Sequence, residues 1–170
     1  MLLWQRTAWL RFFAKTSVYT RAVPPPACAI RPTLHVLTKQ PPQGSTRAAA
    51  AALAGKDYVL LYFSAHWCPP CRGFTPELAS FYSAHAAAKS FEVVFVSSDR
   101  SAAEHGAYYA EMPWLAVPFE DKDTKAALSE KYGVRGIPTL ILLDKTGAVV
   151  TKAARAKVVS SPGTFPNWSD

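Results

Sequence analysis

One short segment, Trp67-Cys68-Pro69-Pro70-Cys71, constrains the fold of this chain more than any other. An apolar run precedes the two cysteines, and residues 72–88, which have helical periodicity, follow them. The order strand, Cys-x-x-Cys, helix is typical of a redox-active thiol pair. The unpaired N–H groups and positive dipole end of a helix N-terminus stabilise a thiolate, so a cysteine pKa falls there from about 8.5 toward about 7. Cys68 and Cys71 are therefore the candidate catalytic residues.

The residues around the cysteines fit this interpretation. Pro69 and Pro70 suit the start of a helix, because proline loses no needed hydrogen bond in the first turn. They also stiffen the loop, which favours rapid attack of one sulfur on the other. Trp67 is either an apolar platform beside Cys68 or a packing residue.

The length of the chain, 170 residues, allows one ordinary domain with an extension. Hydrophobic residues make up 49% of it and aromatic residues 12%, which is enough for a core. Three cysteines do not form a disulfide framework, since pairing Cys68 with Cys71 leaves Cys28 alone. This usage predicts a reducing compartment and one catalytic pair.

The net charge of +7 is unevenly distributed. Residues 1–56 contain eight of the 19 Lys and Arg residues and none of the 12 acidic ones, so the remainder of the chain is nearly neutral. A nucleic-acid-binding protein needs a basic face on its folded domain. We therefore expect no nucleic-acid partner.

Residues 1–30 are predicted to be a basic leader rather than part of the fold. Arg6, Arg11 and Lys15 alternate with large apolar residues, and acidic residues are absent from the segment. This pattern resembles a mitochondrial targeting peptide, and the charges interrupt the run of about 20 apolar residues that a transmembrane helix needs. Cytoplasmic location, with the segment as an irregular basic tail or a misassigned start, is the alternative.

Residues 31–170 are predicted to form a three-layer α/β domain, with a central mixed sheet flanked by helices. The apolar runs 59–65 and 91–97 read as core strands, and a hairpin follows near the C-terminus. The predicted strands are 33–38, 59–65, 91–97, 139–143 and 148–151, and the predicted helices are 48–54, 72–88, 101–111 and 123–132.

A second candidate element lies far from the cysteines, at Gly136-Ile137-Pro138-Thr139. A proline directly before an apolar strand cannot donate to a sheet hydrogen bond. We predict a cis Ile137–Pro138 bond packed against Cys68, with the backbone of Ile137 available to pair an extended substrate. An ordinary trans proline that opens a strand is the alternative.

Several segments together resemble the thioredoxin superfamily, and within it the branch of tryparedoxins and nucleoredoxins. Trp-Cys-Pro-Pro-Cys and the segment 112–119, Met-Pro-Trp-Leu-Ala-Val-Pro-Phe, are specific to that branch. Residues 62–72, 74–76, 94–99 and 136–140 also match it. The resemblance runs from about Leu53 to Trp168. Plain thioredoxins differ by having Gly-Pro between the cysteines, a buried acid where this chain has Tyr62, and a fuller helix than we expect after Thr151.

The resemblance implies a dithiol carrier without a cofactor other than its own Cys68–Cys71 disulfide. The implied donor is trypanothione or a similar dithiol, and the implied acceptors are peroxiredoxins and other disulfide proteins. Nucleoredoxins are usually longer, with several domains, whereas this chain has room for one copy, which favours a tryparedoxin, expected to be a monomer.

Further site residues follow from the resemblance. Trp114 and Pro118 are expected to line the surface beside Cys68, or to form a rigid loop. Tyr62 is a candidate substitute for the missing proton acceptor near Cys71. Glu77 and Arg155 are candidates to contact a charged thiol donor, with a solvated surface charge as the alternative for each.

Four other functions compete with this one. A zinc site needs two ligands besides the cysteine pair at suitable spacing, and the scattered histidines do not supply them, so we expect no metal. A thioredoxin-fold binding module commonly lacks one cysteine, which this chain retains. A nucleoredoxin-like reductase that uses a flavoprotein donor has the same motif. A disulfide isomerase or membrane-tethered reductase needs a secretory signal, which residues 1–30 do not resemble.

Overall fold

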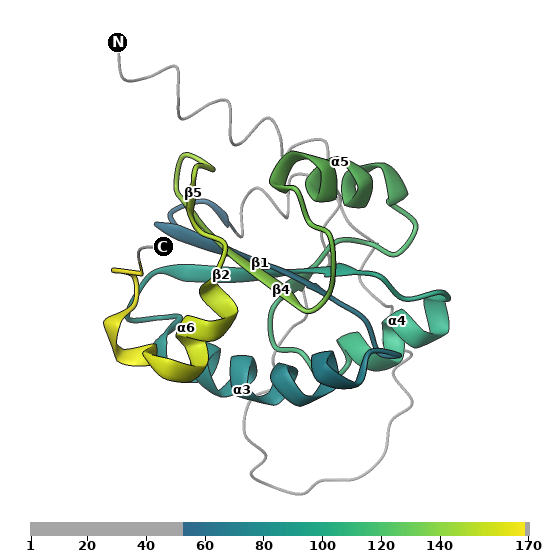
Figure 1. Cartoon of the computed structure of the whole chain (residues 1–170), viewed down its shortest axis with the longest axis horizontal. Helices are drawn as coiled ribbons and strands as arrows, with labels where there is room; N and C mark the ends of the chain where they lie inside the picture. The colour runs from purple at the N-terminus through teal and green to yellow at the C-terminus, as the bar shows by residue number, and fades with distance from the viewer. Residues whose placement is uncertain (1–52, 169–170) are drawn as a thin grey trace, which may run out of the picture.

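Five strands form one mixed sheet in a computed structural model of the chain, which describes residues 53–168 (Figure 1). The strand order is β3-β2-β1-β4-β5. Strand β1 pairs in parallel with β2 on one side and antiparallel with β4 on the other. The strands are β1 (Tyr58–Ser64), β2 (Phe91–Ser97), β3 (Leu115–Ala116), β4 (Thr139–Asp144) and β5 (Val149–Thr151).

Helices cover both faces of the sheet, as predicted. Helices α3, α4 and α6 lie below the sheet in Figure 1, and α5 lies above it. A hydrophobic cluster lies on each face of the sheet. Leu60 and Leu142 belong to the cluster on the side of α3 and α6, whereas Leu61 and Leu143 belong to the cluster on the side of α5. The helices are α3 (Pro69–His85), α4 (Ala102–Tyr109), α5 (Lys122–Tyr132), α6 (Ala154–Ser160) and the 3₁₀ helix η1 (Pro162–Thr164).

The helix ends follow local chemistry. Ser101 caps α4 by accepting a hydrogen bond from the backbone N–H of Glu104 at 3.2 Å. Asp121 caps α5 by accepting one from the backbone N–H of Thr124 at 3.1 Å. Gly133 ends α5 in the left-handed region, with φ 65° and ψ 39°, which favours glycine.

The predicted elements between residues 59 and 151 are found within a few residues of their predicted ends. Strand β2 has the predicted bounds, and α3 begins three residues earlier than predicted, because Pro69 and Pro70 already belong to its first turn. The two-residue strand β3 was not predicted. The predicted strand 33–38, the segment 1–30 and nearly all of the predicted helix 48–54 lie outside the described residues.

The expectation of almost no helix after Thr151 is wrong. Residues 154–160 form α6, and Ala154 and Val158, four residues apart, are buried on its inner face. Alanine, arginine and lysine favour a helix, and this apolar pair places it against the sheet. Phe165 and Trp168 complete the same core: the ring centroids of Phe165 and Phe91 lie 4.8 Å apart.

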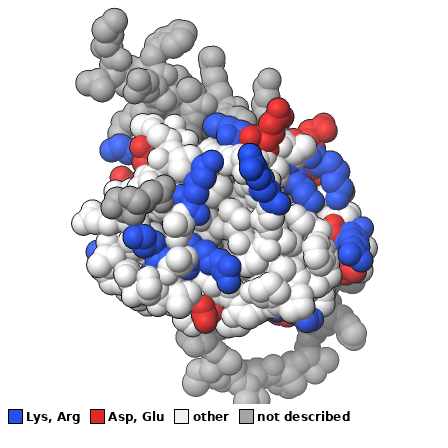
Figure 2. Space-filling model, viewed as in Figure 1, with Lys and Arg blue, Asp and Glu red and all other residues white. Residues whose placement is uncertain are grey.

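The charges of the folded domain are mixed. Figure 2 shows Lys and Arg side chains at several separate places on one face, with Asp and Glu side chains beside some of them. Within residues 53–168, no helix combines the length and the apolar character that crossing a membrane requires.

Candidate active site

Both cysteines of the motif lie at the N-terminus of α3. Cys68 is the N-cap residue, and Pro69 and Pro70 fill the first helical positions. Both thiols are free. Cys71 is completely buried, whereas Cys68 retains 5% of its exposure. Cys68 is therefore the more accessible residue of the pair.

Cys71 is held in its protonated form. Burial, and after it a hydrogen bond with Cys68, raise the pKa of the Cys71 thiol to about 11. Hydrogen bonds from the Ser64 side chain and the Ala65 backbone act in the opposite direction, because they favour the thiolate. Cys71 thus keeps its proton at neutral pH in the reduced protein. A buried, protonated Cys71 next to a Cys68 that keeps some exposure suits a pair in which Cys68 attacks first and Cys71 follows.

Trp67 lies on the surface directly before Cys68, with 44% of its area exposed. Its indole N–H donates to the backbone carbonyl of Ser98 at 3.0 Å, which fixes the ring over the end of β2. The guanidinium of Arg100 lies 5.1 Å from the ring centroid, within cation–π range. The ring of Trp67 is therefore exposed but fixed in position beside Cys68. The role of Trp67 as a substrate platform stays a prediction.

Hydrogen bonds also connect the loop before Trp67 to the end of β2 and the residues that follow it. The backbone N–H of His66 donates to a carboxylate oxygen of Asp99 at 2.7 Å. Ser97 donates to the other oxygen of Asp99 at 2.7 Å, so the carboxylate is positioned on both sides. These bonds tie the cysteine loop to the neighbouring strand.

The Ile137–Pro138 bond is cis. Ile137 packs against a small cluster formed by Ala65, Cys68 and Cys71. The chain thus brings together two motifs that lie nearly 70 residues apart in the sequence. Pairing of the Ile137 backbone with a substrate stays a prediction.

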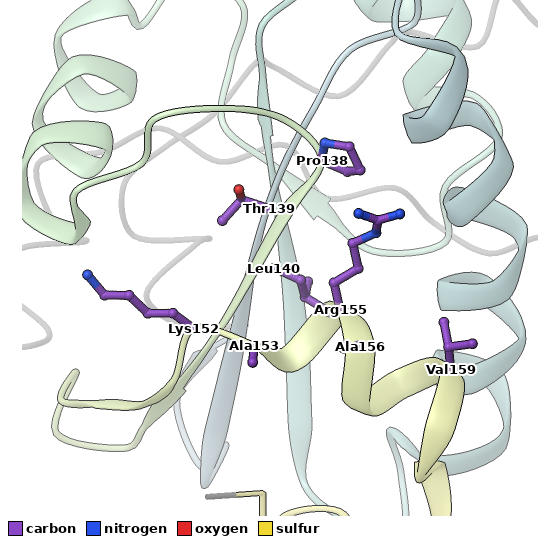
Figure 3. Close-up of a pocket in the computed structure, with 8 residues that line it drawn as sticks. All are labelled: Pro138, Thr139, Leu140, Lys152, Ala153, Arg155, Ala156 and Val159. Atoms are coloured by element: carbon purple, nitrogen blue, oxygen red, sulfur yellow. The ribbon is translucent and has the colours of Figure 1, made fainter. Parts of the chain in front are cut away.

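A pocket of about 520 Å³ adjoins Pro138 (Figure 3). Arg155 extends from α6 toward Pro138, and its guanidinium lies 5.7 Å from the ring centroid of Phe74. The pocket is therefore partly cationic and lies on the side of α6. Its lining residues are Pro138, Thr139, Leu140, Lys152, Ala153, Arg155, Ala156 and Val159.

Tyr62 lies behind Cys71, but it is not a proton acceptor. Its hydroxyl donates to the backbone carbonyl of Cys71 at 3.2 Å. Burial raises the pKa of Tyr62 far above its ordinary value, so the phenol stays neutral throughout the physiological range. The prediction for Tyr62 is wrong because a neutral phenol has no capacity to take the proton of a thiol.

Trp114 does not line the active-site surface, so that prediction is also wrong. Its exposure is 1%, and its ring packs edge-on against Tyr62 and Tyr82 in the core. The reason is that the chain after it enters the sheet as β3, which turns the indole inward. Pro118 is buried as well. Glu77 is exposed on α3, and its role toward a donor stays a prediction.

Three hydroxyl residues near Cys71 were not predicted: Ser64, Thr75 and Tyr108. Ser64 had a signal in the sequence, because it shares one face of β1 with Tyr62. Thr75 had one as well, since it follows Cys71 by one helical turn. Tyr108 had none, because α4 brings it from a distant part of the chain.

Metal-binding groups do not gather in the described part of the chain. Among residues 53–168, no three His, Cys, Asp or Glu side chains lie close enough together to hold a metal ion.

The comparisons with known proteins agree with this geometry. Residues 55–149 match the model of a family described as thioredoxin-like. Tryparedoxin of Trypanosoma brucei brucei is 49% identical over 125 residues, which cover 72% of this chain and 86% of that protein. The chain belongs to the thioredoxin-like family, in the branch of tryparedoxins and nucleoredoxins.

Solved structures of the same branch have the same fold. A tryparedoxin II from C. fasciculata aligns with a TM-score of 0.76 at 39% identity, over 98% of this chain and 96% of that one. A tryparedoxin II complexed with glutathionylspermidine aligns with a TM-score of 0.68 at 48% identity, over 72% of this chain and 85% of that one.

Human nucleoredoxin is 48% identical over 104 residues, which cover 61% of this chain. This chain spans only about a quarter of the nucleoredoxin length, since the match covers 24% of that protein. The chain is thus a thioredoxin-fold oxidoreductase related to tryparedoxin and nucleoredoxin.

Proposed function

We propose that this chain is a tryparedoxin-like thiol–disulfide oxidoreductase that carries electrons from a dithiol donor to protein disulfides through Cys68 and Cys71. The observation that supports this most is the cysteine pair at the start of α3, in which Cys68 retains 5% of its exposure, whereas Cys71 is completely buried and protonated.

The catalytic cycle has two exchange steps. The Cys68 thiolate attacks the acceptor disulfide, so a Cys68–acceptor bond forms, the acceptor S–S bond breaks, and the departing sulfur takes up a proton. Cys71 then loses its proton and attacks Cys68, which forms the Cys68–Cys71 bond and releases the second acceptor thiol. The acceptor has gained two electrons and two protons, and a donor dithiol returns them to the protein.

Trypanothione is the proposed donor, and peroxiredoxins and other disulfide proteins are the proposed acceptors. Two observations support the donor: a 48% identical tryparedoxin II has been solved with glutathionylspermidine, and a pocket containing Arg155 adjoins Pro138. A guanidinium is suited to bind a carboxylate such as those of a glutathione moiety. Glu77 is proposed to contact a cationic group of the donor.

A coupled assay of the full chain tests this proposal. NADPH oxidation is followed with trypanothione, glutathione or a thioredoxin-reductase-type flavoprotein as donor, and with a peroxiredoxin or insulin as acceptor. We expect the highest turnover with trypanothione. Equal or higher turnover with glutathione contradicts the donor assignment, and a protein without turnover in any combination is a binding module.

The second candidate is a nucleoredoxin-like reductase supplied by a flavoprotein. The 48% identity to human nucleoredoxin over 104 residues favours it. Turnover with the flavoprotein donor alone, in the same assay, supports this candidate against the first.

For the molecule as a whole, we propose a monomer with a domain at residues 31–170 and a mitochondrial leader at residues 1–30. A fluorescent protein fused to residues 1–30 is expected to enter mitochondria, and the variant with Arg6, Arg11 and Lys15 changed to Gln is expected to remain in the cytoplasm. Import of both fusions, or of neither, contradicts the leader.

A further inference from the structure

The arginines of residues 53–168 all lie in segments that build the site or adjoin it, and all are exposed. None of their guanidinium groups has an ion-pair or hydrogen-bond partner within this part of the chain. A guanidinium binds a carboxylate through two parallel N–H···O bonds, so free arginines around a reaction centre indicate an anionic partner. These residues are Arg72, Arg100, Arg135 and Arg155.

Arg100 lies on the β2 side of Cys68. Its guanidinium lies 5.1 Å from the ring centroid of Trp67, whose indole is fixed by its hydrogen bond to Ser98. The backbone N–H of Arg100 donates to the carboxylate of Glu104 at 3.0 Å, so the main chain from which the guanidinium extends is fixed as well. A guanidinium that lies over an aromatic face keeps its N–H donors for another partner. Arg100 is therefore held beside Cys68 with its donors free.

Arg135 lies on the other side of Cys68. It precedes Ile137 by two residues, and Ile137 packs against the cluster that contains Cys68. Two residues span at most about 7 Å of chain, so Arg135 adjoins the backbone that is predicted to pair with a substrate. Strands β2 and β4 flank β1 on opposite sides. Since Arg100 follows β2 and Arg135 precedes β4, the two arginines flank the cysteine loop that follows β1.

The donor pocket leaves these two arginines unoccupied. The donor is proposed to bind in the pocket that contains Arg155, on the side of α6, and neither Arg100 nor Arg135 lines that pocket. Both guanidinium groups therefore stay available to the other substrate of the exchange, the protein acceptor, which is large enough to contact both sides of Cys68.

Given the thiol exchange proposed above, we infer that Arg100 and Arg135 select protein acceptors whose reactive disulfide has acidic residues on both sides. The acceptor segment lies over Cys68 between the two guanidinium groups, and each guanidinium binds one carboxylate. An extended chain advances about 3.3 Å per residue, so the acidic residues are expected within about four positions of the reactive cysteine. The two arginines bind the acceptor and take no part in bond formation.

Two disulfide-linked peptide dimers test this selection. Both peptides have a single cysteine, with Glu near it on both sides in one peptide and Gln at the same positions in the other. The full chain is reduced and freed of reductant, and the release of peptide thiol from each dimer is followed. Each rate is divided by the rate of dithiothreitol with the same dimer, because carboxylates slow the attack of any thiolate.

We expect wild type to prefer the Glu peptide about tenfold at low salt after this correction, since two exposed ion pairs contribute modestly each. The preference is expected to fall to about threefold or less in about 0.5 M salt, because salt screens exposed charges.

Variants assign the preference to the two arginines. Arg100→Gln and Arg135→Gln are each expected to lower it about threefold, and the double variant is expected to abolish it. The matched control is Lys89→Gln combined with Lys145→Gln, which removes the same charge from exposed positions. Lys89 precedes β2 and Lys145 follows β4, at the end of the sheet that contains Tyr58 and lies away from the cysteine loop. We expect this control to keep the wild-type preference.

The outcomes separate this inference from the proposed function. If wild type releases no thiol from either peptide, the proposed exchange fails and the inference falls with it. If wild type reduces both peptides at equal corrected rates, the exchange stands and the inference about Arg100 and Arg135 is wrong. If the lysine control loses the preference as fully as the double arginine variant does, net charge causes the preference, and the inference is again wrong.

Discussion

Tyr62 precedes Cys68 by six residues, and its hydroxyl lies among those of Ser64 and Thr75 and the carbonyl of Cys71. Burial opposes the phenolate so strongly that Tyr62 serves the site only as a neutral hydrogen-bonding group. Where plain thioredoxins have a buried acid, this chain thus has a set of hydroxyl groups behind Cys71. The chemistry at this position consists of hydrogen bonding rather than proton storage.

Removal of the Tyr62 hydroxyl tests this view. Loss of a general base costs about 10²- to 10⁴-fold in rate. We expect Tyr62→Phe to lose much less activity than that, because the phenol of Tyr62 is neutral and donates a hydrogen bond to the backbone carbonyl of Cys71. The measurement is kcat in the coupled assay, and a loss of 10²-fold or more in a folded variant identifies Tyr62 as the base after all.

The two tryptophans near the site are expected to behave in opposite ways. Trp67→Ala removes an exposed side chain beside Cys68, so kcat/KM for a protein acceptor falls while the stability changes little. Trp114→Ala empties part of the core and costs about 3–5 kcal/mol of unfolding free energy. Chemical denaturation with the coupled assay checks both, and an unaltered stability of Trp114→Ala contradicts its place in the core.

At the scale of elements, the site is assembled where three of them meet. The cysteine loop follows strand β1, the two thiols lie at the N-terminus of α3, and Ile137, in the segment before β4, packs against the cluster that contains Cys68. The antiparallel pairing of β1 with β4 brings the cysteine loop and the segment before β4 together, because Phe63 lies opposite Thr139 in the register. The site therefore depends on correct pairing of distant strands.

The turn between β4 and β5 gives this hairpin a dependence on pH. Partial burial alone raises the pKa of Asp144, but hydrogen bonds from Thr146, Ala148 and Gly147 outweigh it and hold the pKa below its usual value. A carboxyl with a lowered folded-state pKa stabilises the protein above its unfolded pKa of about 4, and this contribution is lost as the pH falls through the lower, folded value.

We therefore expect Asp144→Asn to reduce the free energy of unfolding at pH 7 and to have a smaller effect at pH 3. The measurement is a urea denaturation series between these two pH values. Asp123→Asn is the control, since that carboxylate is exposed in the first turn of α5. A constant difference between wild type and Asp144→Asn across the series contradicts the assigned role of the turn.

At the scale of the whole molecule, the sheet was largely predictable because its strands are continuous apolar runs covered on both faces. The cysteine motif was predictable because its chemistry depends on a local order of strand, loop and helix. The positions of Trp114 and Tyr108 were not predictable, since each depends on how distant elements pack. Helix α6 was missed because its seven residues carry a buried pair, Ala154 and Val158, too short to produce a clear periodicity.

The most direct test of the whole account is to trap the intermediate of the exchange. Cys71→Ser is incubated with an oxidised acceptor, and the products are identified by non-reducing electrophoresis and mass spectrometry. Cys68→Ser is the control. We predict a stable disulfide between Cys68 of Cys71→Ser and the acceptor, and no adduct with Cys68→Ser. Wild-type turnover by Cys68→Ser, or trapping of the acceptor through Cys71 in that variant, contradicts it.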